Sequence, residues 1–274
     1  MIVVRAKTMG FCPGVQKAFE KAFLTADKAE KEGKKCYLYG QFVHNQVATD
    51  SLLEKGILLG KDILKEEPGY LITRVHGIPE KEKRSFEEKG FIPVDCVCPV
   101  VKKNAERLKG AEGKKIIIGQ KSHAETLYLS SFFENIPLIS SPEDLSFLEK
   151  GSYEAALQTT FSDEMTSLIL EKAEGKGLKI HLLNSVCNAS VLRRSCLTEL
   201  SEKVDALVVV GDENSANSRE LFHLAESLKP SFFVSSSRNI PYNELKGYRI
   251  LGLTAGASVP AVIYDEIEKK LENL

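Results

Sequence analysis

The segment Lys115-Ile-Ile-Ile-Gly119-Gln-Lys-Ser-His123-Ala-Glu125 joins an apolar run of strand length to a glycine and a short polar turn. A helical pattern follows it at residues 126–133. Apolar runs that alternate with amphipathic helical stretches are typical of α/β layers with mainly parallel sheets. The segment therefore predicts a strand that ends in a polar turn at the edge of a parallel sheet.

The same arrangement recurs along the whole chain. One apolar run ends in Gly40-Gln-Phe-Val-His44-Asn45, and a later one ends in Gly211-Asp-Glu-Asn-Ser215-Ala-Asn217. A second strand in each third of the chain ends at Val75-His76-Gly77, at Gln158-Thr159-Thr160 and at Thr254-Ala-Gly-Ala-Ser258. We infer an α/β protein of three similar α/β units around a common centre, with bounds at residues 1–97, 98–186 and 187–274.

The pattern predicts individual elements throughout the chain. Strands are expected at residues 35–39, 70–74, 115–118, 155–158, 206–210 and 249–253. Helices are expected at residues 15–32, 46–55, 81–89, 100–109, 126–133, 163–176, 192–203, 218–228 and 260–272. Ligands of open parallel sheets bind beyond the carboxyl ends of the strands, so the polar turns are the expected binding region.

Composition narrows the class of protein. The chain has 274 residues, 43% of them hydrophobic, and a formal net charge of −1 from 37 basic and 38 acidic residues. With this balance of charges, the protein has no overall electrostatic field that would attract nucleic acid or an anionic membrane. The first residues lack the pattern of a secretory signal, and no apolar run reaches the roughly 20 residues of a membrane span. We expect a cytoplasmic protein without nucleic-acid or membrane partners.

Six cysteines are present, at positions 12, 36, 96, 98, 187 and 196, and none forms a Cys-x-x-Cys pair. Without a signal peptide, reduced thiols or metal ligands are expected rather than disulfides. Cys12, Cys98 and Cys187 follow the period of the units, because their positions differ by 86 and 89 residues. Cys12 and Cys98 each directly precede a predicted helix and are followed by a proline, which is a familiar setting for iron–sulfur ligands. Cys187 lies between an extended segment and a helix.

These three thiols are the candidate ligands of an iron–sulfur cluster, although any one of them alone would more often be a structural thiol. Three thiolates on a four-iron cluster leave one iron open, which is the mark of a catalytic site. Cys36 and Cys196 are assigned to packing. Cys96 could compete with Cys98, but we expect it to point the other way along an extended segment.

Polar residues at the strand ends suggest a ring of hydrogen-bond donors for a phosphate or diphosphate. Its members are His44, His76, His123, Thr159, Ser215, Asn217 and Ser258. The nucleotide fingerprints Gly-x-x-x-x-Gly-Lys-Ser/Thr and Gly-x-Gly-x-x-Gly do not occur. Glu125 could relay protons as a general acid; the alternative is a glutamate that merely favours a helix N-terminus.

Together these motifs closely resemble the LytB family of 4-hydroxy-3-methylbut-2-enyl diphosphate reductases over essentially the whole chain. They are Gly-Phe-Cys-Pro-Gly-Val at 10–15, Val-His-Asn at 43–45, His-Gly-Ile at 76–78, Asp-x-x-Cys-Pro at 95–99, Gln-Thr-Thr at 158–160, Val-Cys-Asn-Ala-Ser at 186–190, Asn-Ser-x-Asn-Ser-Arg at 214–219 and Thr-Ala-Gly-Ala-Ser at 254–258.

The resemblance implies a pseudo-threefold trefoil around a central 4Fe-4S cluster with three cysteine ligands, Cys12, Cys98 and Cys187. It implies that Glu125 supplies protons, and that the substrate is held by His44, His76, His123, Thr159, Ser215, Ala216 (through its backbone N–H), Asn217 and Ser258. The implied reaction removes the allylic hydroxyl as water and yields isopentenyl and dimethylallyl diphosphate, the last step of the methylerythritol phosphate route. A ferredoxin or flavodoxin is the implied electron donor.

Three positions depart from the family's common pattern. Ala216 stands where a serine is common, Glu213 where a lysine is common, and Ala124 where a proline is common. The first two changes are expected to weaken diphosphate binding, and a related reductase of another substrate is a further alternative. The cluster ligands are unchanged.

Two other classes of protein use similar residues. One is a non-catalytic iron–sulfur protein that carries electrons or senses redox state, and the other is a structural or hydrolytic zinc protein. Glu125 and the three histidines argue against the first, because an electron carrier needs no ring of donors. The absence of a Cys-x-x-Cys pair weakens the second.

Overall fold

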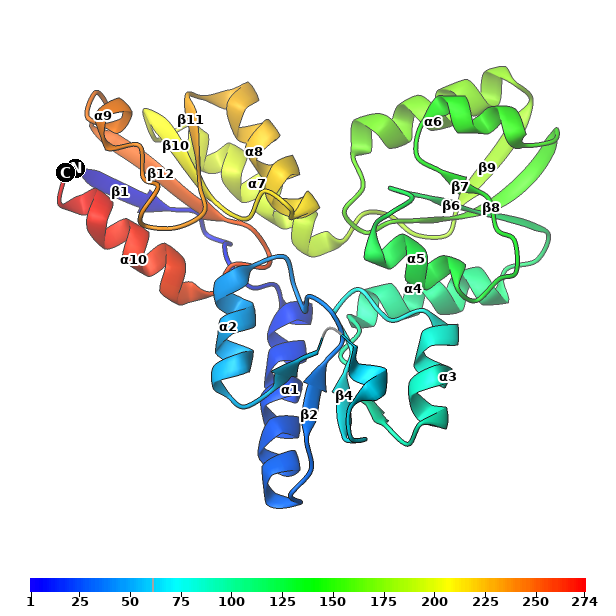
Figure 1. Ribbon diagram of the computed structural model, residues 1–274. Helices are drawn as coiled ribbons and strands as arrows, with labels where there is room; N and C mark the ends of the chain where they lie inside the picture. The colour runs from blue at the N-terminus through cyan, green and yellow to red at the C-terminus, as the bar shows by residue number, and fades with distance from the viewer. Residues whose placement is uncertain (61) are drawn as a thin grey trace. The chain divides into compact units, whose positions relative to one another are not determined.

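The computed structural model describes residues 1–60 and 62–274, and in this part of the chain three four-stranded parallel sheets alternate with helices (Figure 1). The N-terminal sheet has the strand order β3-β2-β4-β5, and the middle sheet has the order β7-β6-β8-β9. The C-terminal sheet reads β11-β10-β12-β1. If the strands of each unit are numbered 1 to 4, with β1 as the fourth strand of the C-terminal sheet, all three sheets have the same spatial order, 2-1-3-4. This shared order confirms the three similar α/β units.

The N-terminal sheet consists of β2 (Cys36–Leu38), β3 (Leu58–Leu59), β4 (Tyr70–Ile72) and β5 (Ile92–Val94). Its neighbouring helices along the chain are α1 (Pro13–Lys31), α2 (Gln46–Glu54), the short 3-10 helix η1 (Ile63–Lys65) and α3 (Glu80–Glu88).

The middle sheet consists of β6 (Lys114–Ile118), β7 (Leu138–Ile139), β8 (Gly151–Leu157) and β9 (Leu178–Leu182). The helices of this part are α4 (Pro99–Gly110), α5 (Ala124–Ser130), the 3-10 helix η2 (Pro142–Phe147) and α6 (Asp163–Gly175).

The C-terminal sheet consists of β10 (Ala206–Val210), β11 (Ser231–Val234), β12 (Ile250–Ala255) and β1 (Ile2–Arg5). Its helices are α7 (Asn188–Ser201), α8 (Ala216–Leu228), α9 (Tyr242–Leu245) and α10 (Ala261–Glu272). β1 pairs with β12 from Ile2 opposite Ile250 to Arg5 opposite Leu253. The beginning of the chain therefore supplies the fourth strand of the last sheet, an arrangement that the sequence pattern did not reveal.

The six predicted strands are all central strands of their sheets; the bounds of β10 match the prediction, and the ends of the other five are shifted by a few residues. The strands that went unpredicted, β1, β3, β5, β7, β9 and β11, are all edge strands. Central parallel strands are covered on both faces and read as continuous apolar runs, as in β10, where all five residues are buried. An edge strand such as β3 is short and exposed and leaves a weaker signal.

By packing, the chain divides into two compact units. Unit 1 contains residues 1–16, 43–54 and 188–274 and carries the C-terminal sheet. Unit 2 contains residues 17–42 and 55–187 and carries the other two sheets. The expected bounds at residues 97 and 186 follow the sequence repeat, which this division does not test, so they stay predictions.

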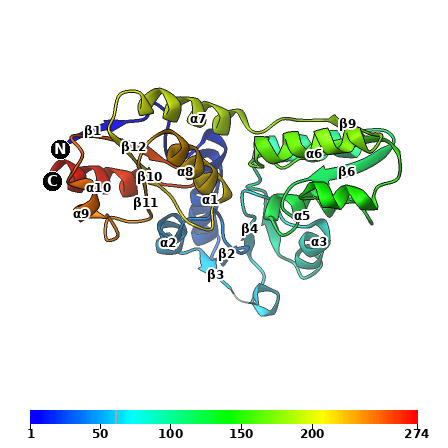
Figure 2. The same cartoon turned by 90° about the horizontal axis from the view of Figure 1, so that it is seen from above.

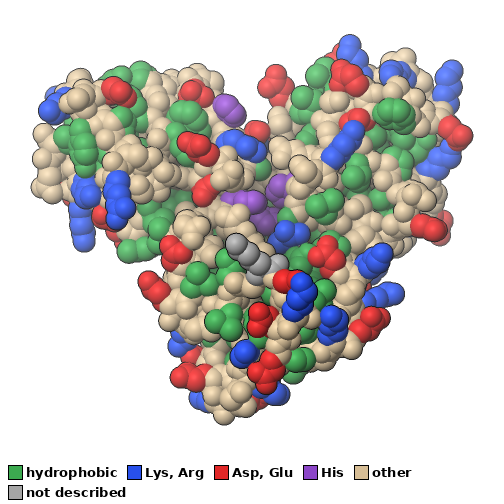
Figure 3. All heavy atoms as spheres, viewed as in Figure 1, with side chains coloured by type: hydrophobic (Ala, Val, Ile, Leu, Met, Phe, Trp, Pro, Cys, Tyr) green, Lys and Arg blue, Asp and Glu red, His purple; other side chains and the backbone are tan. Residues whose placement is uncertain are grey.

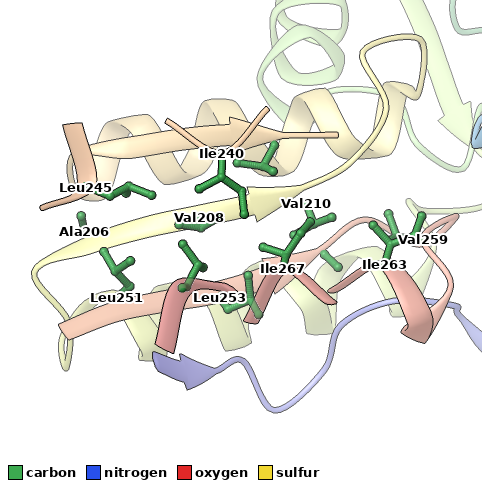
Figure 4. Close-up of a cluster of buried hydrophobic side chains, with 13 residues drawn as sticks. Ala206, Val208, Val210, Ile240, Leu245, Leu251, Leu253, Val259, Ile263 and Ile267 are labelled. Carbon is green, nitrogen blue, oxygen red and sulfur yellow. The ribbon is translucent and has the colours of Figure 1, made fainter. Parts of the chain in front are cut away.

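The core of unit 1 lies on both faces of its sheet. Val208 and Val210 of β10 pack with Ile263 and Ile267 of α10 (Figure 4). The intervening residue Val209 belongs to the cluster of the opposite face, which includes residues of α7 and α8. Figure 2 shows α7 and α10 on opposite sides of this sheet. Alternate side chains of a single strand thus hold two helical layers, as the period of a strand requires.

The surface is polar and mixed in charge. Figure 3 shows Lys and Arg side chains interspersed with Asp and Glu side chains over the visible face. This agrees with the near-zero net charge of the sequence. Among the described residues, no helix combines the length and the apolar character that a membrane crossing requires.

Candidate functional site

The three candidate ligand cysteines occupy the same place in the repeat. Each follows the fourth strand of a sheet and precedes a helix: Cys12 follows β1, Cys98 follows β5 and Cys187 follows β9. In each case the cysteine N–H donates to a carbonyl oxygen in the turn after the third strand of the same sheet. The pairs are Cys12 with Ala257 at 3.3 Å, Cys98 with Val75 at 2.9 Å and Cys187 with Thr159 at 3.0 Å. Backbone geometry therefore fixes all three thiols in the same way.

The start of a helix lies directly after each of these thiols. Cys98 is the N-cap of α4, and Pro99 occupies its first turn. α1 begins at Pro13 and α7 begins at Asn188, each one residue past its cysteine. The N-terminal end of a helix carries partial positive charge, which suits an anionic group such as an iron–sulfur cluster with its cysteine ligands.

Burial separates these cysteines from the others. All six are free thiols; Cys12, Cys98 and Cys187 are partly exposed, whereas the other three are buried. Burial raises the pKa of the Cys36 thiol to about 11 and that of the Cys96 thiol to about 12. Cys96 is therefore a poor thiolate donor, although it lies only two residues before Cys98.

The donor set suits an iron–sulfur cluster chemically, because three accessible thiols stand at helix N-termini. Among residues 1–60 and 62–274, no three His, Cys, Asp or Glu side chains are gathered closely enough to hold a single metal ion. Cys12 belongs to unit 1, and Cys98 and Cys187 belong to unit 2.

Glu125 is a fully buried carboxyl group in the first turn of α5. Its Oε1 accepts a hydrogen bond from the Thr159 backbone N–H at 2.9 Å, and its Oε2 accepts one from the Thr159 hydroxyl at 2.7 Å. Desolvation raises the pKa of Glu125 to about 7, against the lowering effect of these two bonds. A carboxyl group with this pKa is partly protonated at neutral pH and can both give and take a proton.

Two histidines lie beside this carboxyl group. His123 is the N-cap of α5, and its Nδ1 accepts from the Glu125 backbone N–H at 3.2 Å. A neutral His123 therefore carries its proton on Nε2 and can donate from there. The rings of His76 and His123 meet edge to face, with 5.2 Å between their centroids. Unit 2 thus brings together four of the predicted site residues, His76, His123, Glu125 and Thr159.

Unit 1 holds the remaining polar residues, and Ser215, Asn217 and Ser258 lie beyond the C-terminal ends of strands β10 and β12 of its sheet. Ser215 is the N-cap of α8, and its hydroxyl accepts from the Ser218 N–H at 3.4 Å. Asn217 accepts a hydrogen bond from the Ser190 hydroxyl at 3.2 Å through Oδ1. Its Nδ2 is buried and has no hydrogen-bond partner among the described residues. Such a buried donor is what an anionic oxygen would satisfy.

The turn after β12 meets both α8 and the His44 segment. Ser258 donates through its hydroxyl to the His44 carbonyl oxygen at 3.2 Å. A Cβ atom at Gly256 would lie 2.3 Å from Oγ of Ser218, and one at Gly211 would lie 2.6 Å from Cβ of Ser218. Only glycines let the first turn of α8 approach both strand ends so closely.

The two departures in this loop have different surroundings. Ala216 is buried at the first position of α8, so its backbone N–H belongs to the helix N-terminus. Glu213 is exposed and precedes the helix by three residues. Its side chain therefore places a negative charge near the N-terminus of α8, which is the end of a helix that favours anions.

Three residues of the site regions were quoted in sequence motifs without receiving a role. Asn45 caps α2 by accepting from the Ala48 N–H at 3.0 Å, and Gln158 accepts from the Gln120 N–H at 2.9 Å. Ser190 holds Asn217 as described above. The sequence signal that could have identified these three residues was their position inside the motifs at 43–45, 158–160 and 186–190. Their contacts come from the fold.

Comparison with known proteins gives a consistent result. The family model described as LytB protein matches residues 3–272. A 4-hydroxy-3-methylbut-2-enyl diphosphate reductase of Alkaliphilus oremlandii is 32% identical over 283 residues and covers 100% of both chains. The protein of that name in Clostridioides difficile is 32% identical over 278 residues, with 98% of each chain covered.

Solved structures show the same fold. The E-1-hydroxy-2-methyl-but-2-enyl-4-diphosphate reductase of Plasmodium falciparum superposes with a TM-score of 0.88 at 24% identity, covering 98% of this chain and 87% of that one. A second structure, described as (E)-4-hydroxy-3-methyl-but-2-enyl diphosphate reductase, the terminal enzyme of the non-mevalonate pathway, has a TM-score of 0.72 at 24% identity, with full coverage of both chains.

Proposed function

Because the chain belongs to the LytB protein family, we propose that it reduces 4-hydroxy-3-methylbut-2-enyl diphosphate in the final step of the non-mevalonate isoprenoid route. The substrate takes up two electrons and two protons, its allylic C–O bond breaks, and water leaves. The products are isopentenyl diphosphate and dimethylallyl diphosphate. The activity is that of an oxidoreductase.

Cys12, Cys98 and Cys187 are the proposed ligands of one 4Fe-4S cluster. The observation that supports this most is their identical place in the repeat, where each cysteine N–H is bonded to the turn after a third strand. When bound, such a cluster supplies the electrons and an open, Lewis-acidic iron for the substrate hydroxyl. A ferredoxin or flavodoxin is the proposed donor of these electrons.

Glu125 is the proposed proton donor to the leaving oxygen. Its burial and its pKa of about 7 keep a proton available at neutral pH. The two bonds from Thr159 fix the direction of both carboxyl oxygens. The Thr159 hydroxyl, which already donates to that carboxylate, can relay a proton to Glu125 when its oxygen takes up another proton in the same step.

The substrate, mostly through its diphosphate, is the proposed partner of the remaining polar residues. The residues assigned to it are His44, His76, His123, Thr159, Ser215, Ala216 (through its backbone N–H), Asn217 and Ser258. The unsatisfied Nδ2 of Asn217 and the N-terminus of α8 favour an anionic oxygen in unit 1. In unit 2, a neutral His123 carries its proton on Nε2, because its Nδ1 accepts from the Glu125 N–H.

Turnover of 4-hydroxy-3-methylbut-2-enyl diphosphate by the anaerobically purified chain, with a chemical reductant, tests this function. We expect both products and one water per two electrons consumed. A brown protein that takes up electrons but leaves the substrate intact would instead be an electron carrier. A colourless protein with stoichiometric zinc would contradict the cluster as well.

The Glu125→Gln variant tests the assignment of the proton donor. It should keep the cluster's colour and the affinity for substrate but lose most turnover, because glutamine has no acidic proton to give. Glu112→Gln, at an exposed position of the same unit, is the matched control and should keep full activity. Turnover near the wild-type rate in Glu125→Gln would refute the assignment.

A further inference from the structure

Arg193 of α7 is 1% exposed, and it is the largest of the fully buried side chains in the described part of the chain. A guanidinium group stays protonated in proteins, and burying a charge costs several kcal/mol unless its hydrogen bonds are well made. The burial of Arg193 therefore indicates that its hydrogen bonds have a specific structural or functional role.

Arg193 contacts the loop that carries Cys12. Its Nη2 donates to the carbonyl oxygen of Gly10 at 2.6 Å, and this bond is buried. The same loop is held by the Gly10 N–H, which donates to the Ala255 carbonyl oxygen at 3.2 Å, and by the Cys12 N–H described above. The segment from Gly10 to Cys12 is thus fixed from both the sheet and α7.

Gly10 itself has little freedom to move. Its φ is +71°, and a Cβ atom there would lie 2.6 Å from Cε1 of Tyr264 on α10. The loop therefore passes between Tyr264 and the Arg193 guanidinium, and only glycine fits this passage. A loss of the arginine would release the loop on one side only.

The buried contacts of the other two ligand loops come from neutral groups, whereas the cations Lys21 and Arg107 donate to carbonyl oxygens of these loops at exposed sites. The Cys96 N–H, two residues before Cys98, donates to the Thr73 hydroxyl at 2.9 Å. Asn184, three residues before Cys187, bonds both backbone groups of Leu157, at 3.0 and 2.8 Å. The Cys12 loop differs from these two loops because the cation that bonds its carbonyl oxygen is buried.

Arg193 also stands on the helix that begins one residue after Cys187. We propose that Arg193 is a positioning residue that holds the Cys12 loop in the geometry for cluster ligation and places a positive charge beside that ligand. This inference rests on the proposed function. A fixed positive charge near a cluster favours its reduced, more negative state and so raises its reduction potential.

The variants Arg193→Gln and Arg193→Lys separate position from charge. Hydrogen exchange of residues 9–14 in the metal-free protein should be about tenfold faster in Arg193→Gln, while residues 96–101 exchange as in wild type. After anaerobic cluster reconstitution, Arg193→Gln should hold less iron, and its potential should be more negative. Arg193→Lys should show faster exchange but a potential near that of wild type.

Arg107→Gln is the matched control, because Arg107 also donates to a carbonyl oxygen, that of Leu183 at 3.1 Å, but at an exposed site. It should change neither exchange at residues 9–14 nor the potential. Wild-type exchange and potential in the Arg193 variants would overturn the inference, and if Arg193→Gln does not fold, Arg193→Lys decides alone. Wild-type protein that takes up no iron would overturn the proposed function instead, and the exchange experiment would still test the hold on the loop.

Discussion

Replacing Glu125 by glutamine should change how the stability of the protein depends on pH. The pKa of Glu125 is raised from its ordinary value of 4.5 to about 7 by burial, so the folded state holds a proton that the unfolded state releases between these pH values. The stability from this group is fully present below pH 4.5 and is lost as the pH rises through 7.

The size of the effect follows from the shift. At about 1.36 kcal/mol per pKa unit, ionising Glu125 in place costs about 3 kcal/mol of unfolding free energy by pH 8. Glutamine stays neutral, and its amide can still pair with the backbone N–H and hydroxyl of Thr159. The unfolding free energy of Glu125→Gln, minus that of wild type, should therefore grow by about 2.5 kcal/mol between pH 5 and pH 8, because part of the effect already appears below pH 5.

Urea unfolding of metal-free protein at several pH values measures this difference. The Glu112→Gln control should differ from wild type by the same amount at every pH, because that side chain is exposed. A difference for Glu125→Gln that stays constant from pH 5 to pH 8 would refute the account of a buried carboxyl group that holds its proton at neutral pH.

Other substitutions test the surroundings of the site. Thr159→Val removes the hydroxyl that lowers the pKa of Glu125, so the alkaline limb of the pH–activity profile, where the proton donor is lost, should move to higher pH; an unmoved profile would contradict the contact. Gly77→Ala should cost at least about 2 kcal/mol of unfolding free energy in a urea titration, because φ is +100° and a Cβ atom would lie 2.3 Å from Cγ of Tyr128; a smaller loss would mean that this packing yields easily. Glu213→Lys should lower the KM for the diphosphate several-fold, and the gain should shrink at high salt; an unchanged KM would place the side chain away from the substrate.

The sequence was most informative where strands are covered on both faces. The run Ala206–Val210 is apolar at every position, and its residues are buried, so strand and bounds were predicted correctly. β1 could not be found in this way, because its four residues, Ile2–Arg5, are exposed or only partly buried. Its partner β12 lies almost the whole chain away, and no local pattern records such a pairing.

The features of the site also divide into those that the sequence pattern predicted and those that it could not. The spacing of the cysteines predicted their shared place, because a repeat of the fold repeats its loops. The hydrogen bond from Arg193 to Gly10 could not be predicted from the sequence, since an arginine inside an amphipathic helix normally faces water. The pKa of Glu125 likewise depends on burial by residues far apart in the chain.

The central claim is a cluster ligated by Cys12, Cys98 and Cys187, and the pair of adjacent thiols tests it most directly. Iron content and visible absorption should be measured for anaerobically purified Cys98→Ser and Cys96→Ser. We expect the first variant to lose the cluster and the brown colour, and the second, whose thiol is buried with a pKa of about 12, to keep both. Retention of a full cluster in Cys98→Ser, or its loss only in Cys96→Ser, would contradict the assignment of the ligands.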